Sequence, residues 1–159
     1  MDGRKVSESQ SVVSQVMMPN DANNLGNVFG GVILSLVDHV AGVAAIRHAR
    51  QPCVTVSMDQ VVFKEPIHLG ELVTAKASVN FTGHTSMEVG VYVESENVLT
   101  GVRRHTNSCY VTYVAVDAMG RPVPVPPIIP ESDVEKRRYK AAEARRKARL
   151  QERKAHEGK

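Results

Sequence analysis

The chain is organised around a polar loop that leads directly into one long apolar segment. The loop, residues 19–31, contains one aspartate, four asparagines and three glycines, which are residues that favour turns. From Val32 to His48 the apolar residues recur with the spacing of one face of an α-helix. A single apolar helix must be covered by other elements, so we expect the rest of the chain to pack strands on it.

The segments around this helix have the alternating pattern of β-strands. From Val73 to Phe81, apolar residues alternate with polar ones, which predicts one buried face that includes Phe81. Four other segments, separated by turn residues, also have strand character. The expected strands are residues 11–18, 53–64, 73–81, 87–94 and 103–116. The sequence therefore predicts an α+β fold in which a five-stranded antiparallel sheet wraps around one long central helix.

One charged residue, Asp38, lies in the middle of the predicted helix. At about 100° per residue, Asp38 is roughly 170° from the apolar stripe that should face the core. The stripe consists of Val32, Ile33, Leu36, Val37, Val40, Val43 and Ala44. The neighbours of Asp38 on the opposite side are also uncharged, namely Leu34, Ala41, Gly42 and Ala45. We therefore expect a second subunit to cover that side.

An aspartate at such an interface has two possible roles that the spacing leaves open. It is either a structural residue that accepts hydrogen bonds, or a general base that orients water. The Gly30-Gly31 pair at the helix start bears on this choice, because unpaired N–H groups there could stabilise an oxygen that gains negative charge. Asn23 is either a turn-capping residue or an amide that holds a water or a carbonyl group.

Charge divides the chain into a body and a tail. Residues 131–159 hold eleven Lys or Arg against six Asp or Glu, whereas the whole chain has a formal net charge of +3, which leaves −2 for residues 1–130. The capping box of Ser132 and Glu135 predicts a charged helix in the tail, and its thin apolar content favours a solvated tail over an arm that binds a partner. We expect a flexible N-terminus over residues 1–10 and a single domain over residues 11–130. The basic tail does not make nucleic acid an expected partner of the body.

The cysteines and the hydropathy pattern indicate the compartment. Cys53 and Cys109 lie in apolar runs without neighbouring metal-ligand residues, so free, buried thiols are expected. No segment near the N-terminus resembles a signal peptide, and no apolar run is expected to reach the roughly 20 residues of a membrane span. These features predict a cytoplasmic protein with no membrane span and no metal site.

A set of spaced motifs over about residues 12–140 resembles the hot-dog-fold acyl-CoA thioesterases, specifically the group of brain-type cytosolic acyl-CoA hydrolase and its short bacterial relatives. The matching residues are Met18 to Asn23, Gly26, Phe29 to Gly31, Asp38, Arg47-His48, Val54 to Asp59, Phe63, Pro66-Ile67, Gly70, Ser86 to Glu88 and Pro124 to Pro126. The resemblance implies hydrolysis of acyl-CoA to a free acid and CoA. It also implies a homodimer, commonly assembled into a hexameric trimer of dimers.

The resemblance assigns roles to the residues of the loop and the helix. Asn23 of one subunit and Asp38 of its partner would form one site, with Gly31 polarising the thioester carbonyl and Gly30 shaping the turn. For CoA we expect basic and hydroxyl residues near strand ends, which are Arg103, Arg104, Lys64, Thr85 and Ser86. CoA is part of substrate and product, so no further cofactor is expected. The alternative is a non-catalytic acyl-CoA sensor with the same fold.

Overall fold

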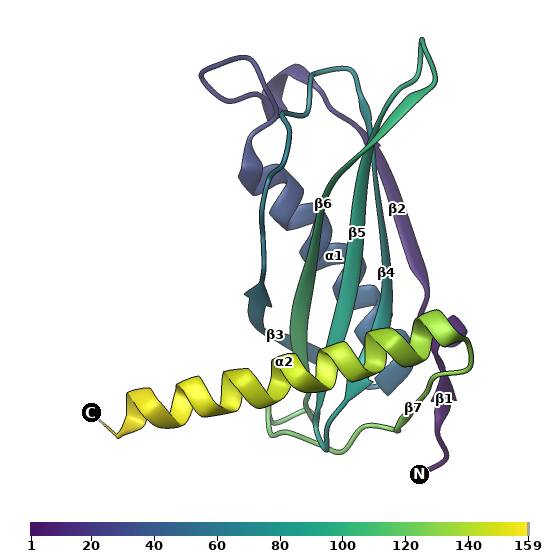
Figure 1. Ribbon diagram of the computed structural model, residues 1–159, viewed down its shortest axis with the longest axis vertical. Helices are drawn as coiled ribbons and strands as arrows, with labels where there is room; N and C mark the ends of the chain where they lie inside the picture. The colour runs from purple at the N-terminus through teal and green to yellow at the C-terminus, as the bar shows by residue number, and fades with distance from the viewer. Residues whose placement is uncertain (159) are drawn as a thin grey trace.

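The computed structural model describes residues 1–158 and has the predicted α+β architecture. One antiparallel sheet has the strand order β2-β4-β5-β6-β3, with α1 on its inner face and α2 crossing its outer face (Figure 1). The elements are β1 (Arg4–Lys5), η1 (Val6–Glu8), β2 (Ser11–Val16), η2 (Pro19–Asp21), α1 (Gly30–Ala49), β3 (Cys53–Asp59), β4 (Leu72–Thr82), β5 (Ser86–Asn97), β6 (Val102–Ala115), β7 (Ile128–Ile129) and α2 (Asp133–Glu157).

Helix α1 fills the concave inner face of the sheet, and its buried face is wider than predicted. Ala41 and Ala45, which were expected to be covered by a second subunit, are completely buried within this chain. Conversely, Val43 was expected in the core stripe but is 45% exposed, and Ile46 beside it is 47% exposed. The face of α1 turned away from the chain therefore passes through Val43 and Ile46. Asp38 lies on the flank of the buried face, not opposite to it.

The length of α1 contradicts the expectation that no apolar run reaches the length of a membrane span. With 20 residues it is long and apolar enough to cross a membrane, judged by length and composition alone. In the structure it is the core helix, and it packs against every strand of the large sheet. Its apolar composition therefore follows from burial in the core of this chain.

Two strand predictions are wrong in detail. The second predicted strand ends at Asp59, so that Lys64 lies in the following loop. In β4, a register shift between Val79 and Phe81 pairs Phe81 with Glu88 of β5, whose side chain reaches α2. Phe81 therefore lies on the outer face and contacts the ring of Tyr139, with ring centroids 4.9 Å apart. A bulge of this kind cannot be read from alternation, because it interrupts the period of two.

The N-terminal ten residues, expected to be flexible, contain regular structure. Arg4–Lys5 pairs in parallel with Ile128–Ile129, which lies in the proline-rich segment 121–130, and Val6 is buried. Ser9 is also buried, and its hydroxyl accepts a hydrogen bond of 2.9 Å from the N–H of Val79. These contacts attach the start of the chain to the edge of the main domain.

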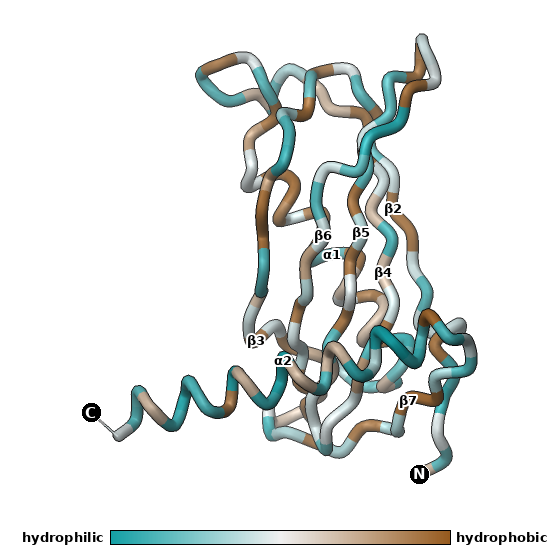
Figure 2. Tube along the Cα trace, in the orientation of Figure 1, coloured by the Kyte–Doolittle hydropathy of each residue, from teal (hydrophilic) through white to brown (hydrophobic). Residues whose placement is uncertain are grey.

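Helix α2 begins at the predicted capping box but is not simply a solvated tail. Figure 2 shows its mostly hydrophilic residues, yet its first half lies across the sheet. Arg145 forms two hydrogen bonds to Glu88, of 2.7 and 3.1 Å, and the Glu88 side chain is only 1% exposed. Arg149 adds an ion pair of 2.7 Å to Asp59. Buried charge pairing therefore docks this helix on the sheet.

We predict that Arg145→Ala lowers the free energy of unfolding by about 3 kcal/mol, because it removes the main partner of a buried carboxylate. The matched control is Arg153→Ala on the same helix, whose pair with Glu157 is exposed and should contribute less than about 1 kcal/mol. Denaturant unfolding of the two variants and the wild type measures the difference. Equal stability of the two variants would contradict the docking role of Arg145.

Candidate functional site

The carboxylate of Asp38 is held by two hydroxyl groups of its own chain. The hydroxyl of Thr55 donates to Asp38 Oδ1 at 2.8 Å, and the hydroxyl of Tyr113 donates to the same oxygen at 2.7 Å. The Tyr113 hydroxyl also lies 2.8 Å from the backbone carbonyl oxygen of Asp38. Within residues 1–158, Oδ2 forms no hydrogen bond or ion pair. One oxygen is thus fixed, and the other is available to accept a proton or orient water.

Strand register brings the two hydroxyls together. Thr55 of β3 is paired directly with Tyr113 of β6, so both side chains lie on the sheet face that packs on α1. Burial, together with the hydrogen bond to Asp38, raises the pKa of Tyr113 far above its usual value. Tyr113 therefore remains a protonated donor at neutral pH.

The sequence alone indicated no role for Thr55 or Tyr113. Thr55 was part of a matched motif, and Tyr113 was part of the expected strand over residues 103–116. The signal that could have found Tyr113 is a hydroxyl in a strand that is otherwise apolar, because such a group needs a buried partner. Identifying Asp38 as that partner requires the pairing of β3 with β6.

The start of α1 exposes backbone donors without a side-chain cap. Phe29 occupies the N-cap position and makes no capping hydrogen bond. A side chain at Gly31 would collide with the Phe29 ring, and one at Gly30 would contact the ring of Phe63. Both glycines are therefore suited to this crowded start, where N–H groups and the helix dipole favour a negatively charged oxygen.

Asn23 has the structural role of a turn-former in this chain. Its side-chain oxygen accepts hydrogen bonds from the N–H groups of Leu25, at 2.9 Å, and Asn27, at 3.2 Å. The side-chain NH₂ group of Asn23 has no hydrogen-bond partner within residues 1–158. The loop thus orients the amide and leaves two donor hydrogens for another group.

Distance along α1 limits what one chain can do alone. Gly31 and Asp38 are seven residues apart, which corresponds to about 10 Å along the helix axis. A reacting carbonyl and its attacking water must lie roughly 3–3.5 Å apart. Thus the helix start and Asp38 of one chain cannot flank the same reacting carbon. This separation favours a site that combines the two groups from different chains.

The structure does not bring the five candidate CoA residues into one place. Arg103 and Arg104 lie at one end of the sheet, near the loop that holds Lys64, whereas Thr85-Ser86 lies at the other end of β5, roughly 35 Å away. Arg104 is also occupied, because it donates to the buried carboxylate of Glu71 at 3.0 Å. A single CoA-binding surface on one chain therefore cannot include all of them.

The described residues form neither a reactive cysteine site nor a cluster of metal-ligating side chains. Both cysteines are free; Cys109 is buried as predicted, whereas Cys53 is half-buried. Burial raises the pKa of each thiol to about 11, so both are protonated at neutral pH. Across residues 1–158, no three His, Cys, Asp or Glu side chains are grouped so that they could hold a metal ion.

Comparison with known proteins identifies the family. Residues 25–102 match the family model described as the thioesterase superfamily. The chain is 41% identical over 128 residues to an uncharacterized acyl-CoA thioester hydrolase of Bacillus subtilis, covering 80% of this chain and 74% of the relative.

Solved structures agree with this assignment. The crystal structure of an apo-hexameric acyl-CoA thioesterase is 39% identical, with a TM-score of 0.92 and coverage of 96% of this chain and 97% of the other. An acyl-CoA hydrolase of Staphylococcus aureus, solved with butyryl-CoA and CoA, is 36% identical with a TM-score of 0.87 and coverage of 96% and 95%. Its variants with alanine in place of one aspartate, one asparagine or one threonine were also solved. The chain therefore belongs to the thioesterase superfamily and has the hot-dog fold of its acyl-CoA hydrolases.

Proposed function

We propose that the protein hydrolyses acyl-CoA to a free carboxylic acid and CoA at a site shared between two subunits. The observation that carries this proposal is the Asp38 carboxylate, which has one oxygen fixed by Thr55 and Tyr113 and the other free. A carboxylate held in this way has the geometry of a general base that orients water. A chain of this family that retains such a group is expected to be an enzyme and not only a sensor.

The Staphylococcus aureus variants support the choice of residues. The asparagine, aspartate and threonine replaced in that enzyme have the same spacing along its chain as Asn23, Asp38 and Thr55 have here. The geometry adds Tyr113 to this set, because its hydroxyl holds the same oxygen of Asp38 as Thr55 does. We assign Thr55 and Tyr113 as positioning residues that act through Asp38.

The proposed reaction is a direct attack of water on the thioester. Asp38 Oδ2 accepts a proton as the water oxygen bonds to the carbonyl carbon. The carbonyl oxygen becomes negatively charged next to the N–H of Gly31 of the partner subunit, with Gly30 shaping the turn and the Asn23 NH₂ donating to the same oxygen. The carbonyl then re-forms, the carbon–sulfur bond breaks, and the thiolate of CoA takes up the proton. The products are a carboxylic acid and CoA.

The surface of the single chain is consistent with a homodimer. Within residues 1–158, strand β3 is an edge strand whose outer backbone groups have no neighbouring strand, and its residues Val54 and Val56 are 48% and 59% exposed. Val43 and Ile46 of α1 are also exposed. Pairing of two β3 edges would cover unpaired strand groups and exposed apolar side chains. By similarity to the hexameric relatives, we propose that three such dimers assemble into a hexamer.

The basic residues near strand ends remain our candidates for CoA binding. Arg103 lies at the start of β6, and the backbone N–H of Lys64 donates to the carbonyl of Thr106 in the same strand. Figure 1 shows this end of the sheet beside the start of α1. Thr85-Ser86 lies at the far end and could reach the same CoA only from a different subunit. We retain the cytoplasm as the predicted compartment.

Release of free thiol from acyl-CoA substrates tests the activity. We expect thiol release well above the buffer rate from at least one of a short-, medium- or long-chain acyl-CoA, without added metal or cofactor. Release measured with a thiol-reactive dye provides the rate. Acyl-CoA binding without thiol release at any chain length would instead support the sensor alternative.

Mixing of inactive variants tests whether the site is shared. Asn23→Ala and Asp38→Ala should each lower kcat by roughly 100-fold or more. Dissociated and reassembled together, they should regain about a quarter of the wild-type activity, because half of the dimers then contain one intact site. The control is each variant reassembled alone. If both residues acted within one chain, every site in the mixture would be defective and no activity would return.

The variant Tyr113→Phe tests the positioning role of the hydroxyl. We expect kcat to fall by roughly 10-fold with little change in KM. Thr55→Ser, which keeps its hydroxyl, should retain most of the activity. A kcat of Tyr113→Phe within about twofold of the wild-type value, or an equal loss of activity in Thr55→Ser, would contradict the positioning role.

A further inference from the structure

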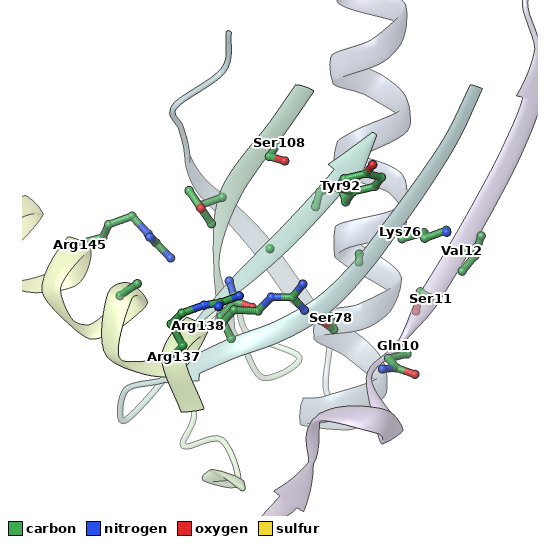
Figure 3. A pocket seen from close by; sticks show the side chains of 16 residues that line it. Gln10, Ser11, Val12, Lys76, Ser78, Tyr92, Ser108, Arg137, Arg138 and Arg145 are labelled. Carbon is green, nitrogen blue, oxygen red and sulfur yellow. The ribbon is translucent and has the colours of Figure 1, made fainter. Parts of the chain in front are cut away.

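The arginines and the lysines of α2 lie on different sides of the helix. Figure 3 shows Arg137, Arg138 and Arg145 extending from α2 over the strands, where they line a groove of about 690 Å³ on the outer face of the sheet. Arg149 also faces the sheet, because it forms an ion pair with Asp59. No lysine of α2 lines this groove. Arginine, whose planar fork suits carboxylate pairing, therefore occupies the side of α2 that faces the sheet.

The four lysines of α2 form a straight row on the side that faces away from the sheet. They are Lys136, Lys140, Lys147 and Lys154, and all four are exposed. At about 100° per residue, each lies about 120–160° around the helix from Ala142, the buried residue of α2. From the first lysine to the last, the row extends over about 27 Å of helix. The spacing of the lysines therefore directs four ammonium groups the same way.

The charge of this row is not neutralised by the protein. Within residues 1–158, lysine forms ion pairs at Lys5 with Glu131 and at Lys76 with Glu94, but not in α2. Glu143 lies at the edge of the row, and in the described part of the chain its carboxylate takes part in no ion pair. Four positive charges therefore face solvent without a partner.

The position of α2 places this row on the outside of the molecule. Figure 1 shows α2 crossing the outer face of the sheet, with its C-terminal end extending beyond β3. In the homodimer proposed above, antiparallel pairing of two β3 edges requires a two-fold axis normal to the sheet. Such an axis leaves the outer faces of both subunits on the same side. The dimer, on whose existence this step rests, then presents two lysine rows on one broad face.

We propose that this face binds the surface of an anionic phospholipid bilayer through the lysine rows. A plane of negative headgroups contacts every lysine of a straight row at once, and it also reaches the second row. Single-stranded nucleic acid fits less well, because the row has no aromatic side chain or arginine on which bases could stack. The residues beside the lysines include Ala144 and Gln151, which are too small or too polar to insert into lipid. Binding is therefore electrostatic and peripheral.

Co-sedimentation of the intact oligomer with lipid vesicles at low ionic strength tests the proposal. We expect binding to phosphatidylcholine vesicles that contain about one third phosphatidylserine, and no binding to phosphatidylcholine alone. Added salt should release the protein, because it screens exposed charges. Lys140→Gln combined with Lys147→Gln should lower the partition coefficient at least about 25-fold, since each lysine near an anionic surface contributes roughly fivefold.

The matched control is Lys5→Gln combined with Arg153→Gln, which removes the same total charge. Lys5 lies in β1, and Arg153 lies about 20° around α2 from Ala142, away from the lysine row. All four substituted side chains are exposed, so both double variants should fold. The control should retain most of the binding. The proposal is overturned if the wild type does not sediment with the anionic vesicles, or if the two double variants bind them within twofold of each other.

Filter retention of a single-stranded RNA tests the competing partner. We expect the wild type to release RNA at a lower salt concentration than it releases the anionic vesicles. If RNA is instead retained at salt concentrations that release the vesicles, and Lys140→Gln with Lys147→Gln abolishes this retention, the row is a nucleic-acid site and the proposal is wrong. Neither assay measures thioester hydrolysis, so failure of the proposal is distinguishable from failure of the proposed enzymatic activity.

Discussion

A carboxylate on the flank of a core helix needs hydrogen-bond donors, and in this protein that requirement links three elements of the fold. Asp38 lies on α1, and its donors Thr55 and Tyr113 lie on β3 and β6. Those two strands are paired at the edge of the sheet, with the donors directly opposite each other. The packing of α1 on the sheet therefore also sets the orientation of the proposed base. Because β3 is the edge strand, the same packing places this carboxylate next to the surface where a second subunit would bind.

On the outer face of the sheet, a buried carboxylate requires a cation as its partner. The buried carboxylate of Glu88 would be costly without a partner, and Arg145 of α2 provides it. This pairing holds a strongly basic helix against the strands and leaves Arg137 and Arg138 above a polar groove. The inner and outer faces thus have separate chemistry: a single carboxylate held by hydroxyls inside, and a cluster of cations outside.

The sequence predicted the architecture well, because each strand and the helix carries its own periodicity. It also indicated Asn23, Gly30, Gly31 and Asp38 as candidate site residues. The predictions failed where one extra residue interrupts the alternation of a strand, and where the burial of a residue depends on segments that are distant in sequence. The bulge before Phe81 turned that side chain outward, and the width of the sheet buried Ala41 and Ala45 within one chain. The charged tail was predicted to be solvated because its partner, Glu88, lies 57 positions away in sequence.

The sequence by itself determined the elements, their order and the family, since these depend on local spacing and on motifs. Only the tertiary structure decided which groups act together. The pairing of β3 with β6 selected Thr55 and Tyr113 as partners of Asp38, and the helical rise between Gly31 and Asp38 showed that one chain does not bring both to one carbon. Likewise, the docking of α2 places Arg137 and Arg138 beside a groove on the outer face of the sheet. The physical reason is that hydrogen bonding and charge pairing act over a few ångströms in space, whereas the residues involved are far apart along the chain.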